Sequence, residues 1–235
     1  MFFGSNLQFL RRKNNITQEQ LAQQMNVSRQ TISKWESGQT PEVSKLLELS
    51  DLLRCSLDDL LRQDLSIHTA SVRYVHVKGF SMARYIVISP NAEKDLRSLL
   101  DAWAQQSGLL NAPYLSWAFP YVSPELRNRF DLSGFEGAYV LPEHFRPAVS
   151  GPKLSFQPDC DYALLSLPEP SGRNPHRIAT AIQVILEHLR QSGIPKSARE
   201  GTLPCFEYRY QKDGISWVDI FLQCRDVSAT ETFSF

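Results

Sequence analysis

Several features that mark other classes of protein are missing from this sequence of 235 residues. No stretch approaches the ~18 consecutive apolar residues of a membrane-spanning helix, and residues 1–6 lack the basic and apolar segments of a signal peptide. The four cysteines (Cys55, Cys160, Cys205, Cys224) form no CxxC pair, and the five histidines show no metal-ligand spacing. We therefore expect a reduced, cytoplasmic protein that uses no metal or other cofactor and has no membrane partner.

The chain also lacks an excess of charge of either sign. Lys plus Arg and Asp plus Glu both number 25, so the formal net charge is zero. Nucleic-acid-binding proteins normally carry a basic excess, and the overall charge alone argues against this class. Hydrophobic residues make up 42% of the chain, which is enough apolar material for a packed core.

Residues 5–63 lack glycine and proline except for Gly38 and Pro41, and their apolar residues recur at helical spacing. Thr17 begins a capping box, and Ser28 is placed to cap the next helix. Pro41 is expected at the first position of a fourth helix, where its missing N–H costs nothing. The pattern predicts five short helices in this region.

The second and third of these helices have the sequence pattern of a DNA-binding helix-turn-helix. We expect a helix over 17–25, a tight turn at Asn26 and a helix over 28–37, because asparagine tolerates the left-handed backbone of such a turn. The outer face of the third helix presents Arg29, Gln30, Ser33 and Lys34. Arginine pairs with guanine and glutamine with adenine, so this helix is predicted to enter the major groove.

Residues 6–62 resemble the phage-repressor and Cro type of helix-turn-helix, the Xre family, through the stretches 16–22 and 27–38. One departure is Asn26, where the family often has glycine. The resemblance implies that DNA is contacted by Gln18, Ser28, Arg29, Gln30, Thr31, Ser33, Lys34 and Thr40. It implies double-stranded DNA with a palindromic operator as the partner, bound by a homodimer. The alternative is a plain helical bundle with a solvated polar face.

Residues 74–235 have a different sequence pattern from the helical N-terminal region. Residues 67–73 are expected to link them to a DNA-binding domain over 1–66. A strand–helix–strand–strand order is predicted twice, with helices over 91–106 and 175–191. Such a repeat predicts two similar halves with a cleft between them. The expected fold class is α+β with two domains: a five-helix bundle, and a duplicated β-α-β-β domain with an antiparallel sheet and a central cleft.

This second region resembles the GyrI-like (gyrase-inhibitor-like) effector-binding domain of several bacterial multidrug-sensing regulators. The motifs that carry the resemblance are 203–208 and 217–221, whereas the family's Gly-Pro-aromatic turn is missing after Ser89 and Leu167. The resemblance implies that Glu207 neutralises a small hydrophobic, cationic effector in the cleft. Trp117, Tyr114, Phe221 and Tyr208 are expected to flank it.

Alternatives remain open for these residues. Glu207 can instead be a structural carboxylate that pairs with Arg209 or a backbone donor, and the aromatic residues can simply pack a core. The function expected from the whole sequence is that of a ligand-responsive bacterial transcriptional regulator without enzymatic activity. Two further hypotheses concern the C-terminal domain: a hydrolase with Glu207 as general base, or a module that holds a protein segment.

Overall fold

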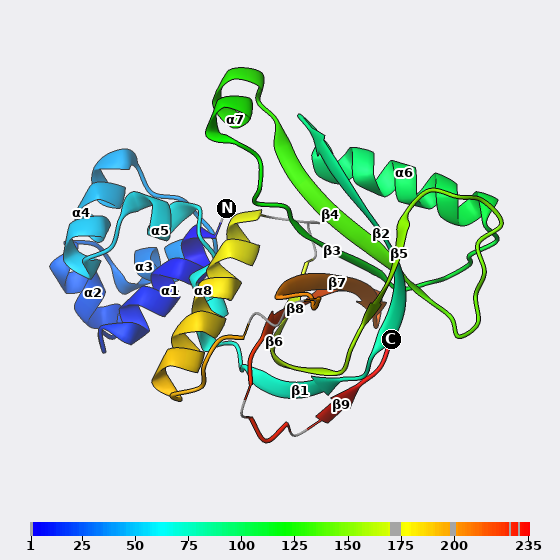
Figure 1. Cartoon of the computed structure of the whole chain (residues 1–235). Coiled ribbons are helices and arrows are strands. Elements are labelled where there is room, and N and C mark those ends of the chain that lie inside the picture. Colours follow the sequence, from blue (N-terminus) through cyan, green and yellow to red (C-terminus); the bar gives the residue numbers. More distant parts are fainter. Residues whose placement is uncertain (1, 170–174, 198–200, 226, 230) are drawn as a thin grey trace. The chain divides into compact units, whose positions relative to one another are not determined.

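The structure of the protein is a computed structural model that describes residues 2–169, 175–197, 201–225, 227–229 and 231–235 (Figure 1). Two units are distinguished within the chain. Unit 1 is Met1–Ala70 with Arg173–Val184, and unit 2 is Ser71–Gly172 with Ile185–Phe235. The domain boundaries expected from the sequence, at residues 66 and 74, stay predictions.

Unit 1 contains the five helices expected from the apolar spacing, followed by a short 3-10 helix. They are α1 (Phe3–Lys13), α2 (Gln18–Gln24), α3 (Arg29–Glu36), α4 (Val43–Leu53), α5 (Leu57–Leu61) and η1 (Leu65–Thr69). Leu7, Leu21, Ile32 and Leu49 are fully buried in their shared core. The prediction of a five-helix bundle is confirmed.

Most of the predicted helix starts are confirmed, and one is wrong. Thr17 forms a capping box with Gln20, and the hydroxyl of Ser28 accepts a backbone N–H of α3. Pro41, however, precedes α4 rather than opening it. The reason is that Glu42, the N-cap, still has extended backbone with ψ of 160°.

Hydrogen bonds of three buried side chains hold unit 1 together across long sequence distances. The amide of Asn6 donates to the carbonyl of Asp59 at 2.8 Å and accepts the N–H of Leu65 at 3.0 Å. Asp64 accepts from Arg177 at 2.9 Å, and their side chains are only 6% and 11% exposed. Arg177 lies in the first turn of α8 (Pro175–Gln191), so the start of this helix belongs to unit 1.

Unit 2 is built on a curled sheet (Figure 1). Its strands are β1 (Arg73–Val77), β2 (Phe80–Ser89), β3 (Tyr114–Ala118), β4 (Ser133–Leu141), β5 (Lys153–Gln157), β6 (Cys160–Pro168), β7 (Cys205–Lys212), β8 (Ile215–Gln223) and β9 (Glu231–Phe233). Within the described residues the strand order is β5-β2-β4-β3-β7-β8-β6-β1-β9. Neighbours pair antiparallel as predicted, except that β9 runs parallel to β1.

The strand–helix–strand–strand order expected from the sequence occurs twice. The first set is β2, α6 (Ala92–Gln106), β3 and β4, and the second is β6, α8, β7 and β8. In both sets the first strand pairs with the last, and β3 pairs with β7 where the sets meet. The sheet residues that follow α6 and α8 therefore lie side by side at the centre of the sheet.

The apolar pattern of the sequence predicts strands over 114–122 and 153–167, and proline shortens both. The first strand ends at Ala118, before Pro120, and the second divides at Pro158 into β5 and β6. The helix α7 (Pro124–Phe130) and the strand β9 were not predicted. The linker expected over 67–73 begins within η1 and ends at the first residue of β1.

The sheet carries a different core on each face. On one face, α6 packs against β2 and β4 through Leu96, Leu100 and Trp103. The opposite face, which we call the aromatic face, carries the cluster of Trp117, Tyr162, Phe206, Tyr208 and Phe221. The chemistry of unit 2 therefore depends on the face from which each side chain projects.

Candidate functional site

The outer face of α3 consists of polar side chains on a firmly anchored helix. Ile32 is fully buried and Trp35 is 5% exposed, so both fix α3 in the core of unit 1. The predicted base-reading residues Arg29, Gln30, Ser33 and Lys34 are all exposed. Because residues three and four apart share a helix face, Gln30, Ser33 and Lys34 project together. Such a set on a rigid helix is what reading base edges requires.

The turn between α2 and α3 has the geometry that the sequence predicts. Asn26 has a φ of 52°, in the left-handed region, and Val27 donates its N–H to the carbonyl of Ala22 at 3.0 Å. Ala22 is 2% exposed, which lets the two helices approach closely. The prediction for Asn26 is confirmed.

The remaining predicted DNA contacts lie around α3, and three of them form bonds within the domain. The hydroxyl of Ser28 accepts the N–H of Thr31 at 3.1 Å, and the two hydroxyls are 2.9 Å apart. The amide of Gln18 donates to Glu36 at 2.8 Å. Thr40 is exposed between α3 and α4. As DNA contacts, all of these residues stay predictions.

Glu36, on α3, accepts hydrogen bonds from one side chain of α1 and one of α2. Arg11 donates from Nε to Glu36 Oε1 at 2.5 Å, and the two side chains are 10% and 4% exposed. Burial opposes ionisation of Glu36, but hydrogen bonds from Arg11 and Gln18 outweigh it and hold the pKa of Glu36 below its ordinary value. The ion pair therefore stays charged at neutral pH and fixes the position of α3.

The predicted ligand-binding residues of unit 2 lie on two faces of the sheet. In the register of β3 and β7, Ser116 pairs with Glu207 and Leu115 with Tyr208. Side chains alternate along a strand, so Glu207 and Tyr114 project from the face that also carries α6. The other three, Trp117, Tyr208 and Phe221, project from the aromatic face. The structure therefore brings the five residues together in two groups.

Glu207 belongs to a buried trio with Arg209 and Glu169. Arg209 donates to Glu207 at 2.5 Å and to Glu169 at 2.9 Å, and the carboxylate residues are 5% and 3% exposed. Burial opposes the charge of Arg209, but the two carboxylates outweigh it and raise the pKa of Arg209. The alternative in which Glu207 pairs with Arg209 is confirmed.

Both carboxylates of the trio contact the one guanidinium of Arg209. Among the described residues, Oε1 of Glu169 is buried without a hydrogen-bond partner. A buried carboxylate oxygen in this state is costly, and a cationic or hydrogen-bonding ligand would stabilise it.

Two carboxylates that were not predicted as site residues lie on the aromatic face. Glu136 accepts from the indole N–H of Trp117 at 3.0 Å and from Arg84 at 2.6 Å. Asp219 accepts from the hydroxyl of Tyr210 at 3.2 Å, and burial raises the pKa of Asp219 above its ordinary value. Asp219 lies within the motif over 217–221, two residues before Phe221. Because side chains alternate along a strand, this spacing places Asp219 on the same face as Phe221 and could have identified it.

The segment 231–235 covers part of the aromatic face. Phe233 lies edge-on to Phe221, with ring centroids 5.3 Å apart, and Phe235 lies edge-on to Tyr208 at 5.2 Å. Phe221 also stacks on Phe206 at 4.5 Å. These aromatic residues therefore pack against one another in a core, which is the alternative to ligand binding given for them above.

Tyr114, the predicted ligand residue beside α6, is also packed. Its ring lies 5.5 Å from that of Tyr139, and the guanidinium of Arg97 lies 4.3 Å from its centroid. Burial raises the pKa of Tyr114 to about 12, so its phenol is neutral at physiological pH. Arg97 and Tyr114 together form a cation–π contact at the surface of α6.

The cysteines are free thiols. Burial raises the pKa of Cys205 to about 12 and that of Cys224 to about 11, which disfavours the reactive thiolate. In the part of the chain that the structure describes, no group of three His, Cys, Asp or Glu side chains is arranged to hold a metal ion. No described helix combines the length and apolar character needed to cross a bilayer.

Comparison with known proteins identifies the N-terminal region. Residues 7–60 match the helix-turn-helix family model HTH_3. The HTH-type transcriptional activator BcrR of Enterococcus faecalis is 48% identical over 62 residues, which span 26% of this chain and 30% of BcrR. Residues 7–60 therefore form a helix-turn-helix domain, and the Xre-type resemblance is confirmed for this region.

Two solved structures resemble parts of the chain. The DNA-binding domain of the P22 c2 repressor is 40% identical, covers 28% of this chain and 88% of its own, and has a TM-score of 0.26. A cryo-EM structure of an EcmrR–DNA complex is 11% identical, covers 90% of this chain and 85% of its own, and has a TM-score of 0.47.

Proposed function

We propose that this chain is a transcriptional regulator that reads operator DNA with α3 and responds to a small molecule bound by unit 2. The observation that carries the proposal is the polar outer face of α3, on a helix held by Ile32, Trp35 and the Arg11–Glu36 ion pair. It lies within the residues that match the helix-turn-helix model.

The operator is proposed to be palindromic and bound by a homodimer. One domain of this size contacts few base pairs, and two half-sites about 34 Å apart would supply the missing specificity. The zero net charge supports this arrangement, because a chain without a basic excess gains little from non-specific attraction to phosphates.

Selection of random DNA duplexes with the purified chain, followed by titration of the selected sequence, tests DNA reading. Lys34→Ala and Gln30→Ala are each expected to weaken binding by about 5- to 150-fold, since a good base contact is worth about 1–3 kcal/mol. Asp51→Asn, a change at an exposed position of α4, is the matched control. Equal affinity for selected and scrambled duplexes would contradict the proposal.

Residues 74–235 are proposed to be a GyrI-like effector-binding domain. The repeated strand–helix–strand–strand order supports this, together with the buried Oε1 of Glu169, which has no hydrogen-bond partner among the described residues. A cationic ligand beside this carboxylate oxygen would stabilise it.

A pair of ions with the same shape and opposite charge tests the effector class. Tetraphenylphosphonium is expected to bind and tetraphenylborate is not, by isothermal titration calorimetry. Glu207→Gln is expected to weaken tetraphenylphosphonium binding about tenfold, the effect of about 1.4 kcal/mol. Glu143→Gln, at an exposed carboxylate, serves as the control. Equal binding of both ions would exclude charge recognition, and an operator affinity unchanged by saturating ligand would exclude the switch.

A further inference from the structure

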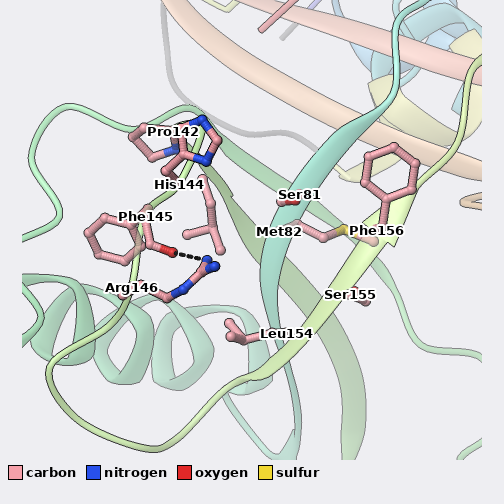
Figure 2. A pocket seen from close by; sticks show the side chains of 10 residues that line it. Ser81, Met82, Pro142, His144, Phe145, Arg146, Leu154, Ser155 and Phe156 are labelled. Atoms are coloured by element: carbon pink, nitrogen blue, oxygen red, sulfur yellow. Dashed lines mark hydrogen bonds between the residues drawn. The ribbon is translucent and has the colours of Figure 1, made fainter.

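We propose that unit 2 holds a second binding site, for a small aromatic carboxylate, in a cavity beside the edge strand β5. The cavity has a volume of about 300 Å³ and lies between β2, β5 and the segment 142–146 that follows β4. Figure 2 shows the side chains of this segment on one side and those of β5 on the other, with Met82 between them. This volume, at the lower end for ligand pockets, suits a molecule with one or two fused rings.

The walls of the cavity are apolar and partly unprotected. Phe145 comes from the segment after β4, and Leu154 and Phe156 from β5. Phe156 is 60% exposed and Leu154 is 52% exposed, although large apolar side chains are stabilised by removal from water. A flat aromatic ring placed in the cavity would cover these surfaces.

The polar groups of the cavity are donors rather than acids. The guanidinium of Arg146 donates to the carbonyl of Phe145 at 3.3 Å, a weak contact that Figure 2 marks. In the described part of the chain, no carboxylate forms an ion pair with Arg146 or His144. The planar guanidinium is the side chain best shaped to bind a carboxylate through two parallel hydrogen bonds.

The segment after β4 turns sharply where it borders the cavity. His144 has a φ of 62°, in the left-handed region that non-glycine residues rarely adopt. Beyond this turn, Phe145 and Arg146 lie on one side of the cavity, opposite the side chains of β5 (Figure 2). An apolar wall and a guanidinium thus border the same cavity, which is the pair of groups that an aromatic carboxylate requires.

The inference is independent of the proposed function, because it involves neither α3 nor the trio on β7. It also predicts a ligand of opposite charge. A carboxylate at Arg146 and a cation at the trio would be recognised by different parts of unit 2, the segment after β4 in one case and β7 in the other.

Calorimetry with 1-naphthoate, 1-naphthamide and 1-naphthylmethylamine tests the proposal on the full chain. These probes share a ring system and differ in charge. 1-Naphthoate is expected to bind at least tenfold more tightly than the amide, and the amine more weakly still. Equal affinity for the acid and the amide would overturn the proposal, and so would the absence of binding by 1-naphthoate.

Variants locate the binding. Arg146→Gln, at an exposed position, is expected to weaken 1-naphthoate binding at least tenfold, whereas Arg129→Gln on α7 is the matched control and should leave it unchanged. Leu154→Glu places a negative charge in the cavity and is expected to abolish binding. Equal losses in the Arg146 and Arg129 variants, or full binding by Leu154→Glu, would show that the probe binds elsewhere. Circular dichroism checks that each variant is folded.

Discussion

Arg209 donates to Glu207, two positions before it on the same face of β7, at 2.5 Å. The same guanidinium also binds Glu169, so one cation serves two buried carboxylates. The residue that the sequence singles out as a ligand carboxylate is thus already part of an ion pair, and any ligand has to act on the trio as a whole.

Substitution of the cation in this trio is expected to cost far more stability than substitution of Glu207. Arg209→Gln leaves two buried carboxylates without their guanidinium, a loss of roughly 3 kcal/mol for a partly exposed partner. Glu207→Gln leaves Arg209 with Glu169 and an electrically balanced pair. Thermal melting of both variants measures the difference. Equal destabilisation would mean that the carboxylates do not share Arg209.

Asn6→Leu is expected to destabilise unit 1 although the two side chains have similar volume. The change removes the acceptor of the Leu65 N–H and the donor to the Asp59 carbonyl, and each buried group without a partner costs about 1–3 kcal/mol. Urea unfolding followed by circular dichroism measures it. The exposed substitution Asn14→Leu, at the C-cap of α1, controls for the added apolar surface. Similar stability of both variants would contradict the structural role of Asn6.

Ser28 allows capping to be separated from DNA contact. Ser28→Ala is expected to destabilise unit 1 by about 1 kcal/mol, because α3 loses its N-cap. Ser28→Asp keeps a good cap and places a negative charge at the predicted DNA surface. We expect the aspartate variant to melt like the natural chain but to bind DNA more weakly. Unchanged DNA affinity in the aspartate variant would show that Ser28 is remote from phosphate.

Phe235→Ala is expected to destabilise unit 2 by roughly 1–3 kcal/mol, less than the ~3–5 kcal/mol of a fully buried phenylalanine. The ring contacts Phe80, Phe206 and Tyr208 on or beside the aromatic face. Phe130, at 54% exposure on α7, gives a matched control whose change to alanine should have little effect. Equal small effects in the two variants would mean that the segment 231–235 leaves the sheet in solution.

His76 makes stability depend on pH. The ring of His76 donates to the carboxylates of Asp161 at 2.8 Å and Asp159 at 3.4 Å. These hydrogen bonds outweigh partial burial and raise the pKa of His76 above its ordinary 6.5. A group whose pKa is raised on folding stabilises the protein below its unfolded pKa. This contribution is lost as the pH rises through the folded value.

The melting temperature of the natural chain is therefore expected to fall, relative to that of His76→Gln, as the pH rises above 6.5 and through the folded pKa of His76. Nuclear magnetic resonance titration of the His76 ring measures the pKa directly. A ring that titrates below 6.5 would contradict the pairing with Asp161.

The N-terminal helices were predictable because their signals are local. The capping box of Thr17, the cap at Ser28 and the left-handed turn at Asn26 all involve residues within a few positions of one another. Pro41 was the exception, since the extended backbone of Glu42 delays α4.

The sites of unit 2 were less predictable because they depend on strand register. The motif at 203–208 identifies Glu207, but only the pairing of β3 with β7 separates it from Tyr208 and Trp117. The partner of Arg209 at Glu169 lies 40 residues away in sequence. A local sequence pattern cannot predict a contact between residues so far apart in the chain. The same limit applies to the contact between Phe235 and Tyr208.

The ion pair between Asp64 and Arg177 joins residues 113 positions apart within unit 1. During synthesis the helices α1 to α5 and the strands β1 to β6 all leave the ribosome before Arg177 does. These helices are thus made before α8, yet their unit receives one of its buried cations only when α8 is made. A fragment that stops at residue 66 would keep the Asp64 carboxylate and lack the guanidinium that binds it in the whole chain.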